Sequence, residues 1–230
     1  MDDLTAVVTG ASRGIGASVA RLFANEGAYV ALCARDDGAL ASVVEGIETD
    51  GGRATGLRAD VRDEFDLERL MEVAAREGDG IDLLVPCAGV YHGSPGETPL
   101  AGESYSAFDD HLRTNGRGVY AAIREAVPHL NGGARVLVPS GSVARDARPE
   151  FGSYAVSKAL AEAVARQFAA ELDAAVGVVD PGTVSTALAG GDGRDPDAVA
   201  AMFRWAAVDA PDEDVDGRVL DLGAWRRATR

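Results

Sequence analysis

The stretch Thr9-Gly10-Ala11-Ser12-Arg13-Gly14-Ile15-Gly16 follows an apolar run at 6–8 and precedes an amphipathic segment at 17–25. A strand, a glycine-rich turn and a helix start in this order form a pyrophosphate site, because free backbone N–H groups at a helix N-terminus bind anions. Gly10 permits the sharp turn, Gly14 lets phosphates approach the backbone, and Gly16 lets the helix pack closely on the strand. A plain tight turn is the alternative, but both flanking elements are present. The stretch therefore predicts a dinucleotide-binding α/β fold, with ligand contacts from Gly10, Ser12, Arg13, Gly14, Ile15 and Gly16.

The rest of the chain alternates between short apolar runs and longer segments with a helical period. The further strand candidates are 29–33, 54–57, 83–85, 135–138, 176–179 and 219–222. Between them, segments such as 67–76 carry apolar residues at the helical spacing. Such alternation implies βαβ units and a parallel sheet covered by helices on both faces. We predict a single Rossmann-like doubly wound domain over residues 1–230, with about seven parallel strands flanked by helices.

Composition restricts the classes of partner. The chain has 230 residues and a formal net charge of −15, which argues against nucleic-acid or anionic-membrane binding. No run of about 18 apolar residues is present and the start, Met1-Asp2-Asp3, lacks the basic residues of a signal peptide. We therefore expect no membrane span and a cytoplasmic location. Two cysteines, Cys33 and Cys87, are too few for a disulfide framework and are expected as small buried residues at strand ends.

The basic residues are unusual, because Lys158 is the only lysine among 22 Lys and Arg residues. An acidic surface repels itself at low ionic strength, and a screening length of about 3 Å at ~1 M salt removes that repulsion. Our hypothesis is a salty cytoplasm, as in a halophile; a merely acidic mesophilic protein is the alternative. The melting temperature should then rise in molar salt, and a melting curve unaffected by salt would contradict the hypothesis.

The end of the second strand candidate bears on the choice of dinucleotide. An Asp or Glu there accepts hydrogen bonds from the ribose hydroxyls and repels a 2′-phosphate, but Ala34 stands at this position. Arg35 follows it and Arg13 lies in the glycine turn. Two guanidinium groups can bind a phosphate by charge-assisted hydrogen bonds, although either side chain could simply be solvated. The pattern favours NADP(H), while Asp36 and Asp37 directly afterwards keep NAD possible.

Tyr154 and Lys158 lie four residues apart, which places both on one face of a helix. A phenol has a pKa near 10, and a neighbouring ammonium group lowers this pKa by stabilising the phenolate. Of the five tyrosines only Tyr154 has a lysine at this spacing. Arginine cannot replace the lysine as a proton relay because its pKa exceeds about 12. A chance pair on a helix surface is the alternative, and we predict an acid/base pair.

At this point the sequence resembles the short-chain dehydrogenase/reductase family over nearly its whole length. The glycine turn at 9–16 is similar to the family's cofactor turn, and 154–158 is similar to its active-site pair. The resemblance implies a catalytic set of Asn115, Ser142, Tyr154 and Lys158. In that set Asn115 holds a water in a relay that ends at Lys158, and Ser142 binds the substrate oxygen. Tyr154 is the acid/base group, and Lys158 also binds the nicotinamide ribose.

The resemblance also implies further cofactor contacts. Asp60 and Val61 are expected to contact the adenine, Asp60 by its side chain, and Ala88 and Gly89 let the cofactor lie close to a strand end. The segment that packs on the nicotinamide is expected to supply Pro181, Gly182, Val184 and Thr186.

The chain departs from the family pattern at three places. Pro86-Cys87 replaces the usual Asn-Asn, which removes polar support for the cofactor. Ser142 lies one position closer to Tyr154 than the family spacing, so Ser140 is a fallback. A substrate lid is expected at about 187–210, and it is short and rich in glycine.

The expected function is an NADP(H)-dependent oxidoreductase that moves a hydride between a nicotinamide and a carbonyl or secondary alcohol. Ser142, Tyr91 and Phe151 are expected to bind the substrate, and His92, Val143, Ala144, Arg145, Thr183 and Val184 should also line the pocket. Arg145 would favour an acidic substrate, with a surface salt bridge as the ordinary alternative. An NAD-linked alcohol or sugar dehydrogenase and a catalytically weak, cofactor-binding regulatory protein remain alternatives.

His92, His111 and His129 are isolated along the chain and no two have metal-ligand spacing, so no metal site is predicted. Family members are commonly dimers or tetramers, and the resemblance therefore implies a homodimer or homotetramer.

Overall fold

A seven-stranded sheet forms the centre of the computed structural model, which describes residues 1–188, 190 and 192–230. Its strand order is β3-β2-β1-β4-β5-β6-β7, and each neighbouring pair is parallel. The strands are β1 (Thr5–Thr9), β2 (Tyr29–Ala34), β3 (Arg53–Arg58), β4 (Ile81–Pro86), β5 (Leu130–Pro139), β6 (Ala175–Asp180) and β7 (Val219–Asp221). The predicted fold class, a parallel sheet of about seven strands in a Rossmann-like arrangement, is confirmed.

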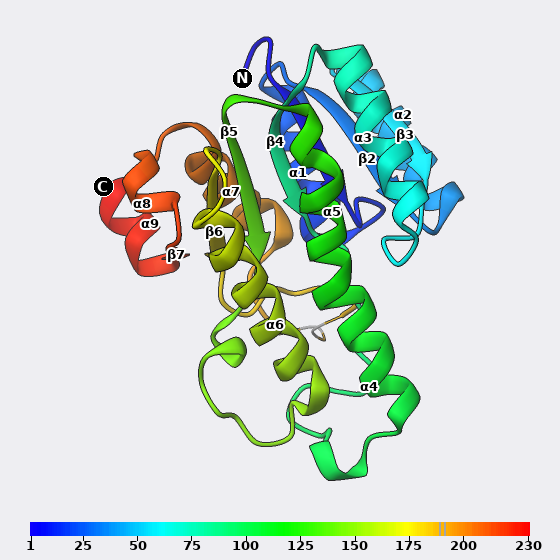
Figure 1. Ribbon diagram of the computed structural model, residues 1–230, viewed down its shortest axis with the longest axis vertical. Coiled ribbons are helices and arrows are strands. Elements are labelled where there is room, and N and C mark those ends of the chain that lie inside the picture. Colours follow the sequence, from blue (N-terminus) through cyan, green and yellow to red (C-terminus); the bar gives the residue numbers. More distant parts are fainter. Residues whose placement is uncertain (189, 191) are drawn as a thin grey trace.

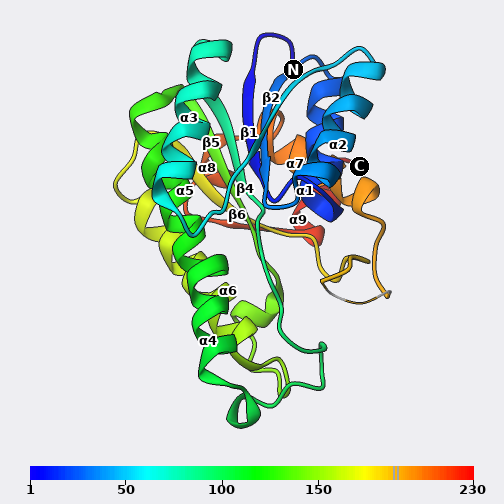
Figure 2. The same ribbon diagram turned by 90° about the vertical axis from the view of Figure 1, so that its right-hand side faces the viewer.

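Helices cover both faces of this sheet, as Figures 1 and 2 show. The described α-helices are α1 (Gly14–Asn25), α2 (Asp37–Thr49), α3 (Glu64–Gly78), α4 (Tyr105–His111), α5 (Gly118–Ala126), α6 (Gly152–Ala169), α7 (Pro196–Val208), α8 (Asp212–Val215) and α9 (Leu222–Ala228). α1, α2 and α7 pack on one face and α3, α5 and α6 on the other. None of the helices within the described part of the chain is long and apolar enough to cross a bilayer.

The inner strands are apolar throughout because helices bury both of their faces. Every residue of β1, β2 and β6 is buried, whereas the edge strand β3 has no buried residue. Aspartates begin several helices by accepting a backbone N–H bond, as Asp36 does at α2, Asp63 at α3 and Asp195 at α7. The acidic residues therefore have a local structural use besides their charge.

The strand order reverses between β1 and β4. The connection after β1 runs on one face and the connection after β4 runs on the other, so a crevice opens at their carboxyl ends. Ligands of doubly wound sheets bind at this switch point. A π-helical segment, Leu112–Arg117, joins α4 to α5 beside this crevice.

The lid expected at about 187–210 stays a prediction, and the structure places most of this range in a helix. Residues 196–208 form α7, whose Phe203 side chain is fully buried in the core cluster shared with α1. Apolar burial against α1 and the sheet therefore fixes residues 196–208 in the core. Ala189 and Gly191, within the expected lid, lie outside the described residues.

Candidate active site

Two cavities adjoin at the carboxyl ends of the strands. The larger, of about 470 Å³, follows the glycine turn, and the smaller, of about 320 Å³, lies beside it. Tyr154 lines both of them, together with Ile15, Thr186 and Leu188. A group bound in either cavity would therefore lie next to the phenol of Tyr154.

The glycine turn has the geometry that its sequence predicts. Gly10 has a φ of +66°, and a Cβ atom there would lie 2.6 Å from the Cα of Ala88. A Cβ atom on Gly16 would lie 2.6 Å from the carbonyl oxygen of Gly10, so only glycine allows α1 to begin so close to the turn. Arg13 precedes α1 without a side-chain cap. The turn thus forms an open cradle at a helix N-terminus.

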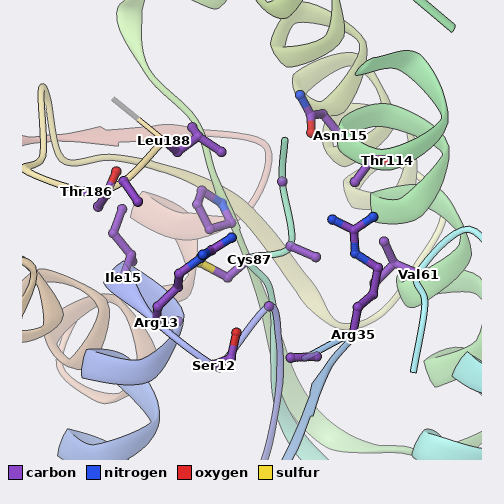
Figure 3. Close-up of a pocket in the computed structure, with 18 of the residues that line it drawn as sticks. Ser12, Arg13, Ile15, Arg35, Val61, Cys87, Thr114, Asn115, Thr186 and Leu188 are labelled. Carbon is purple, nitrogen blue, oxygen red and sulfur yellow. The ribbon is translucent and has the colours of Figure 1, made fainter. Parts of the chain in front are cut away.

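Two arginines reach the larger cavity from separate elements. Figure 3 shows Arg13 on the glycine turn and Arg35 at the end of β2 with both guanidinium groups directed into the cavity. Asp36 also lines this cavity. Its Oδ1 accepts a hydrogen bond from the backbone N of Ala39 at 3.1 Å and caps α2. An arginine-lined cradle of this kind fits a dinucleotide that carries an additional phosphate.

Asp60 also lines this cavity, but its carboxylate is engaged by Arg62. The closest contact, between Arg62 Nη2 and Asp60 Oδ2, is 2.6 Å. This hydrogen bond is the largest cause that lowers the pKa of Asp60. The side chain is thus a fixed anion at the cavity wall.

Most of the predicted cofactor residues are brought together. The larger cavity is lined by Gly10, Ser12, Arg13, Gly14, Ile15, Gly16, Arg35, Asp60, Val61, Ala88, Gly89, Tyr154, Lys158 and Thr186. Gly182 and Val184 line the smaller cavity, whereas Pro181 is buried and lines neither. Sequence reasoning missed Cys87 and Leu188 as lining residues.

Tyr154 and Lys158 both lie on α6, and the expected direction of the pKa shift is wrong. Burial is the largest cause that raises the pKa of Tyr154 to about 12, and Tyr91 and Cys87 raise it further. Lys158 donates a hydrogen bond from Nζ to the carbonyl oxygen of Pro139 at 2.7 Å, and burial lowers its own pKa. A buried ammonium directed at a backbone carbonyl does not offset the desolvation of the phenolate.

The ring of Tyr154 is held by neighbouring aromatic residues. Tyr91 stacks on it at 4.5 Å between centroids, and His111 meets it edge-on at 6.2 Å. His111 accepts a hydrogen bond at Nε2 from the backbone N of His92 and therefore donates from Nδ1 to Ser153 Oγ. His92 and His111 lie 19 positions apart in the sequence, yet the fold brings their ring centroids to 5.0 Å. No metal-ligating cluster occurs among residues 1–188, 190 and 192–230.

The structure separates the two candidate serines. Ser142 lines the smaller cavity with Tyr154, and its Oγ accepts a hydrogen bond from Arg148 Nη2 at 2.8 Å. Ser140 is buried and donates to Glu162 Oε1 at 2.7 Å. The geometry therefore favours Ser142 as the hydroxyl that meets a substrate.

Asn115 lies in the π-helical segment and lines the larger cavity. Its Oδ1 accepts from the backbone N of Val90, and its Nδ2 donates to the Val90 carbonyl oxygen and to Ser157 Oγ. This side chain thus ties the chain after β4 to α6.

Three residues expected in the substrate pocket do not line the smaller cavity, namely His92, Ala144 and Arg145. Arg145 instead pairs with the buried carboxylates of Glu162 and Asp180. These ion pairs join the turn after β5 to α6 and to the end of β6. Six expected residues do line it, which are Tyr91, Ser142, Val143, Phe151, Thr183 and Val184.

Comparisons with known proteins agree with this geometry. The family model described as short chain dehydrogenase matches residues 4–197. The A-factor type gamma-butyrolactone 1'-reductase (1S-forming) of Streptomyces virginiae is 31% identical over 232 aligned residues, 98% of this chain and 88% of that protein. Glycine betaine reductase ATRR of Emericella nidulans is 35% identical over 80% of this chain, which spans only 15% of that protein.

Solved structures extend the likeness to the fold. A short chain dehydrogenase from Burkholderia cenocepacia J2315 in complex with NADP superposes with a TM-score of 0.86 and 28% identity, covering 97% of both chains. Fold, glycine turn and family model agree over most of the sequence, and the chain belongs to the short-chain dehydrogenase/reductase family of oxidoreductases.

Proposed function

We propose that the protein is an NADP(H)-dependent oxidoreductase that interconverts a carbonyl group and a secondary alcohol, with Tyr154 as the acid/base group. The observation that carries this proposal is the position of Tyr154 at the junction of two cavities. One cavity has a glycine cradle and arginines for a dinucleotide, and the other has the Ser142 hydroxyl for a substrate oxygen.

When bound, the cofactor supplies or accepts the hydride. In the reducing direction negative charge grows on the substrate oxygen, Ser142 donates a hydrogen bond to that oxygen, and Tyr154 delivers the proton. A phenol with a pKa of about 12 is protonated throughout the neutral range and is therefore ready to donate. Lys158 lines the larger cavity beside Tyr154 and is suited to hold the ribose hydroxyls.

The assignment of NADP rather than NAD rests on charge. Arg13 and Arg35 are both directed into the cavity, and Asp36 is occupied as the cap of α2. The similar Burkholderia protein was crystallised with NADP, which supports the same choice here.

Replacement of both arginines, Arg13→Ala/Arg35→Ala, should weaken the binding of NADPH more than the binding of NADH. Charge-assisted hydrogen bonds contribute about 1.5–3 kcal/mol each, so the two together predict roughly a 10²–10⁴-fold rise in the KM for NADPH. The KM for NADH should change less than about threefold. Steady-state kinetics with both cofactors measure this, with the exposed Arg21→Ala as the control. An equal loss with NADH would contradict the assignment.

A screen of NADPH and NADH consumption with ketones and aldehydes tests the function itself. Turnover of carbonyl compounds with NADPH supports the proposal, and a preference for NADH favours the NAD-linked alternative. Tight NADPH binding without turnover of any carbonyl would favour the regulatory alternative, which the Pro86-Cys87 replacement suggests.

We also propose a homodimer or homotetramer. Tyr120 on α5 and Val156 and Leu160 on α6 are large apolar residues with about two fifths of their surface exposed on neighbouring helices. The mass of the protein in solution, measured by light scattering, tests this assembly.

A further inference from the structure

The smaller cavity contains one permanently charged side chain among the described residues, and that side chain is Arg148. The other lining residues are neutral, and several are apolar: Ile15, Pro95, Val143, Phe151 and Leu188. The chain as a whole carries a net charge of −15. No carboxylate lines the smaller cavity among the described residues, so the positive charge of Arg148 favours an anionic ligand there.

The guanidinium group of Arg148 has more N–H donors than hydrogen-bond partners. Its Nη2 donates to Ser142 Oγ at 2.8 Å, and its nearest carboxylate, Asp146 Oδ2, is 3.9 Å away. That distance exceeds the 2.7–2.9 Å of charge-assisted hydrogen bonds, and guanidinium carries five N–H donors. The ion pair with Asp146 therefore leaves the fork of Arg148 available for a ligand.

The loop that carries Arg148 is held on both sides. Before it, the backbone N of Asp146 donates to the Ser142 carbonyl oxygen at 2.8 Å. After it, the Glu150 carbonyl oxygen accepts from the backbone N of Gly96 at 3.1 Å and of Thr98 at 3.0 Å. Arg148 is thus placed between two anchors in reach of the hydroxyl that meets the substrate.

We infer that the substrate is an oxo acid, whose carboxylate is bound by Arg148 and whose carbonyl oxygen is bound by Ser142. This inference rests on the function proposed above and names its substrate class. Ser142 Oγ accepts from Arg148, so its own hydrogen is free to donate to a carbonyl oxygen. A carboxylate attached to the carbonyl carbon then lies beside the guanidinium, and the apolar remainder of the substrate packs on Phe151, Val143 and Leu188.

The reaction balances as a two-electron reduction of a 2-oxo acid to a 2-hydroxy acid. A C–H bond forms as the carbonyl carbon gains a hydride from reduced nicotinamide, and the π electrons of the C=O bond move to the oxygen. The Tyr154 O–H bond breaks to protonate that oxygen, and solvent returns a proton to Tyr154. The carboxylate keeps its charge throughout, so Arg148 binds substrate and product alike.

The test compares phenylglyoxylate with its neutral methyl ester in the wild-type enzyme and in two variants. Arg148→Gln removes the charge and leaves an uncharged polar side chain, and Arg148→Lys keeps the charge. For Arg148→Gln we expect kcat/KM for the acid to fall roughly 10–100-fold and that for the ester to change less than about fivefold. Arg148→Lys should recover part of the activity towards the acid. Arg124→Gln, on the exposed side of α5 and paired with Glu125, is the matched control.

A binding measurement separates recognition from turnover. Calorimetric titration of phenylglyoxylate into the enzyme with NADP⁺ should show binding to the wild-type protein and at least tenfold weaker binding to Arg148→Gln. An equal loss of kcat/KM for the acid and the ester would show that Arg148 only positions Ser142, and would overturn the inference. Wild-type activity confined to uncharged carbonyl compounds would overturn it while leaving the proposed function intact. Absence of turnover with every carbonyl compound would defeat the proposed function itself.

Discussion

Tyr154→Phe is expected to lower kcat by about two to four powers of ten, because general acid catalysis contributes roughly 10²–10⁴-fold and no other described proton donor of the site is in its place. Tyr154 lines both cavities, and its phenol has a pKa of about 12 because the residue is buried. Phenylalanine keeps the ring and removes only the hydroxyl. The loss should therefore appear in kcat rather than in cofactor binding.

The fold of this variant should be preserved for a specific reason. The stacking of Tyr91 on the ring at 4.5 Å does not need the hydroxyl. Kd for NADPH, followed by its fluorescence, and the melting temperature should stay close to the wild-type values. Tyr105→Phe on α4, where the tyrosine is 91% exposed, is the matched control. Retention of more than about a tenth of the wild-type kcat would refute the acid role.

Gly10→Ala is expected to destabilise the fold and to disrupt the cofactor cradle. The position has a φ of +66°, and the new Cβ would lie 2.6 Å from the Cα and 2.7 Å from the N of Ala88. The left-handed conformation costs about 1–2 kcal/mol and overpacking about 1–3 kcal/mol more. Because both nearest atoms belong to the backbone, no rotamer change relieves the overlap.

The chain offers a control of opposite sign for this substitution. Gly46 lies inside α2, and a Cβ atom there has no neighbour within 4 Å. Gly46→Ala should stabilise the protein by about 0.5–1 kcal/mol, whereas Gly10→Ala should lower the melting temperature by roughly 5–15 °C. Thermal unfolding with and without NADPH measures both. A Gly10→Ala protein with wild-type stability and NADPH affinity would show that the close approach to Ala88 is dispensable.

Local patterns were sufficient to predict the fold and the cofactor turn. Apolar runs such as 29–33 become strands because helices cover both faces of the sheet. The sequence predicts the glycine turn because a side chain at Gly10 or Gly16 would overlap with backbone atoms, so only glycine fits at these positions. The spacing of Tyr154 and Lys158 likewise placed both on α6.

The partners of the site's side chains could not be predicted from the sequence, because they depend on contacts between segments that are distant in the chain. Arg145 and Arg148 are three residues apart, and only the fold decides that the first meets Glu162 and the second meets Ser142. The pKa of Tyr154 follows from burial, which a sequence spacing does not report. The burial of residues 196–208 in α7 likewise depends on packing against α1, which the sequence pattern alone does not report.

The strand order has a consequence for synthesis of the chain. β1 is synthesised before the other six strands of the sheet, yet in the finished sheet it lies between β2 and β4. β2 can pair with β1 early, but the other edge of β1 stays unpaired until residues 81–86, which form β4, have been translated. An unpaired apolar edge is a template for association with another chain. Nascent chains arrested before β4 should therefore bind chaperones, and this dependence should vanish once β4 has cleared the exit tunnel.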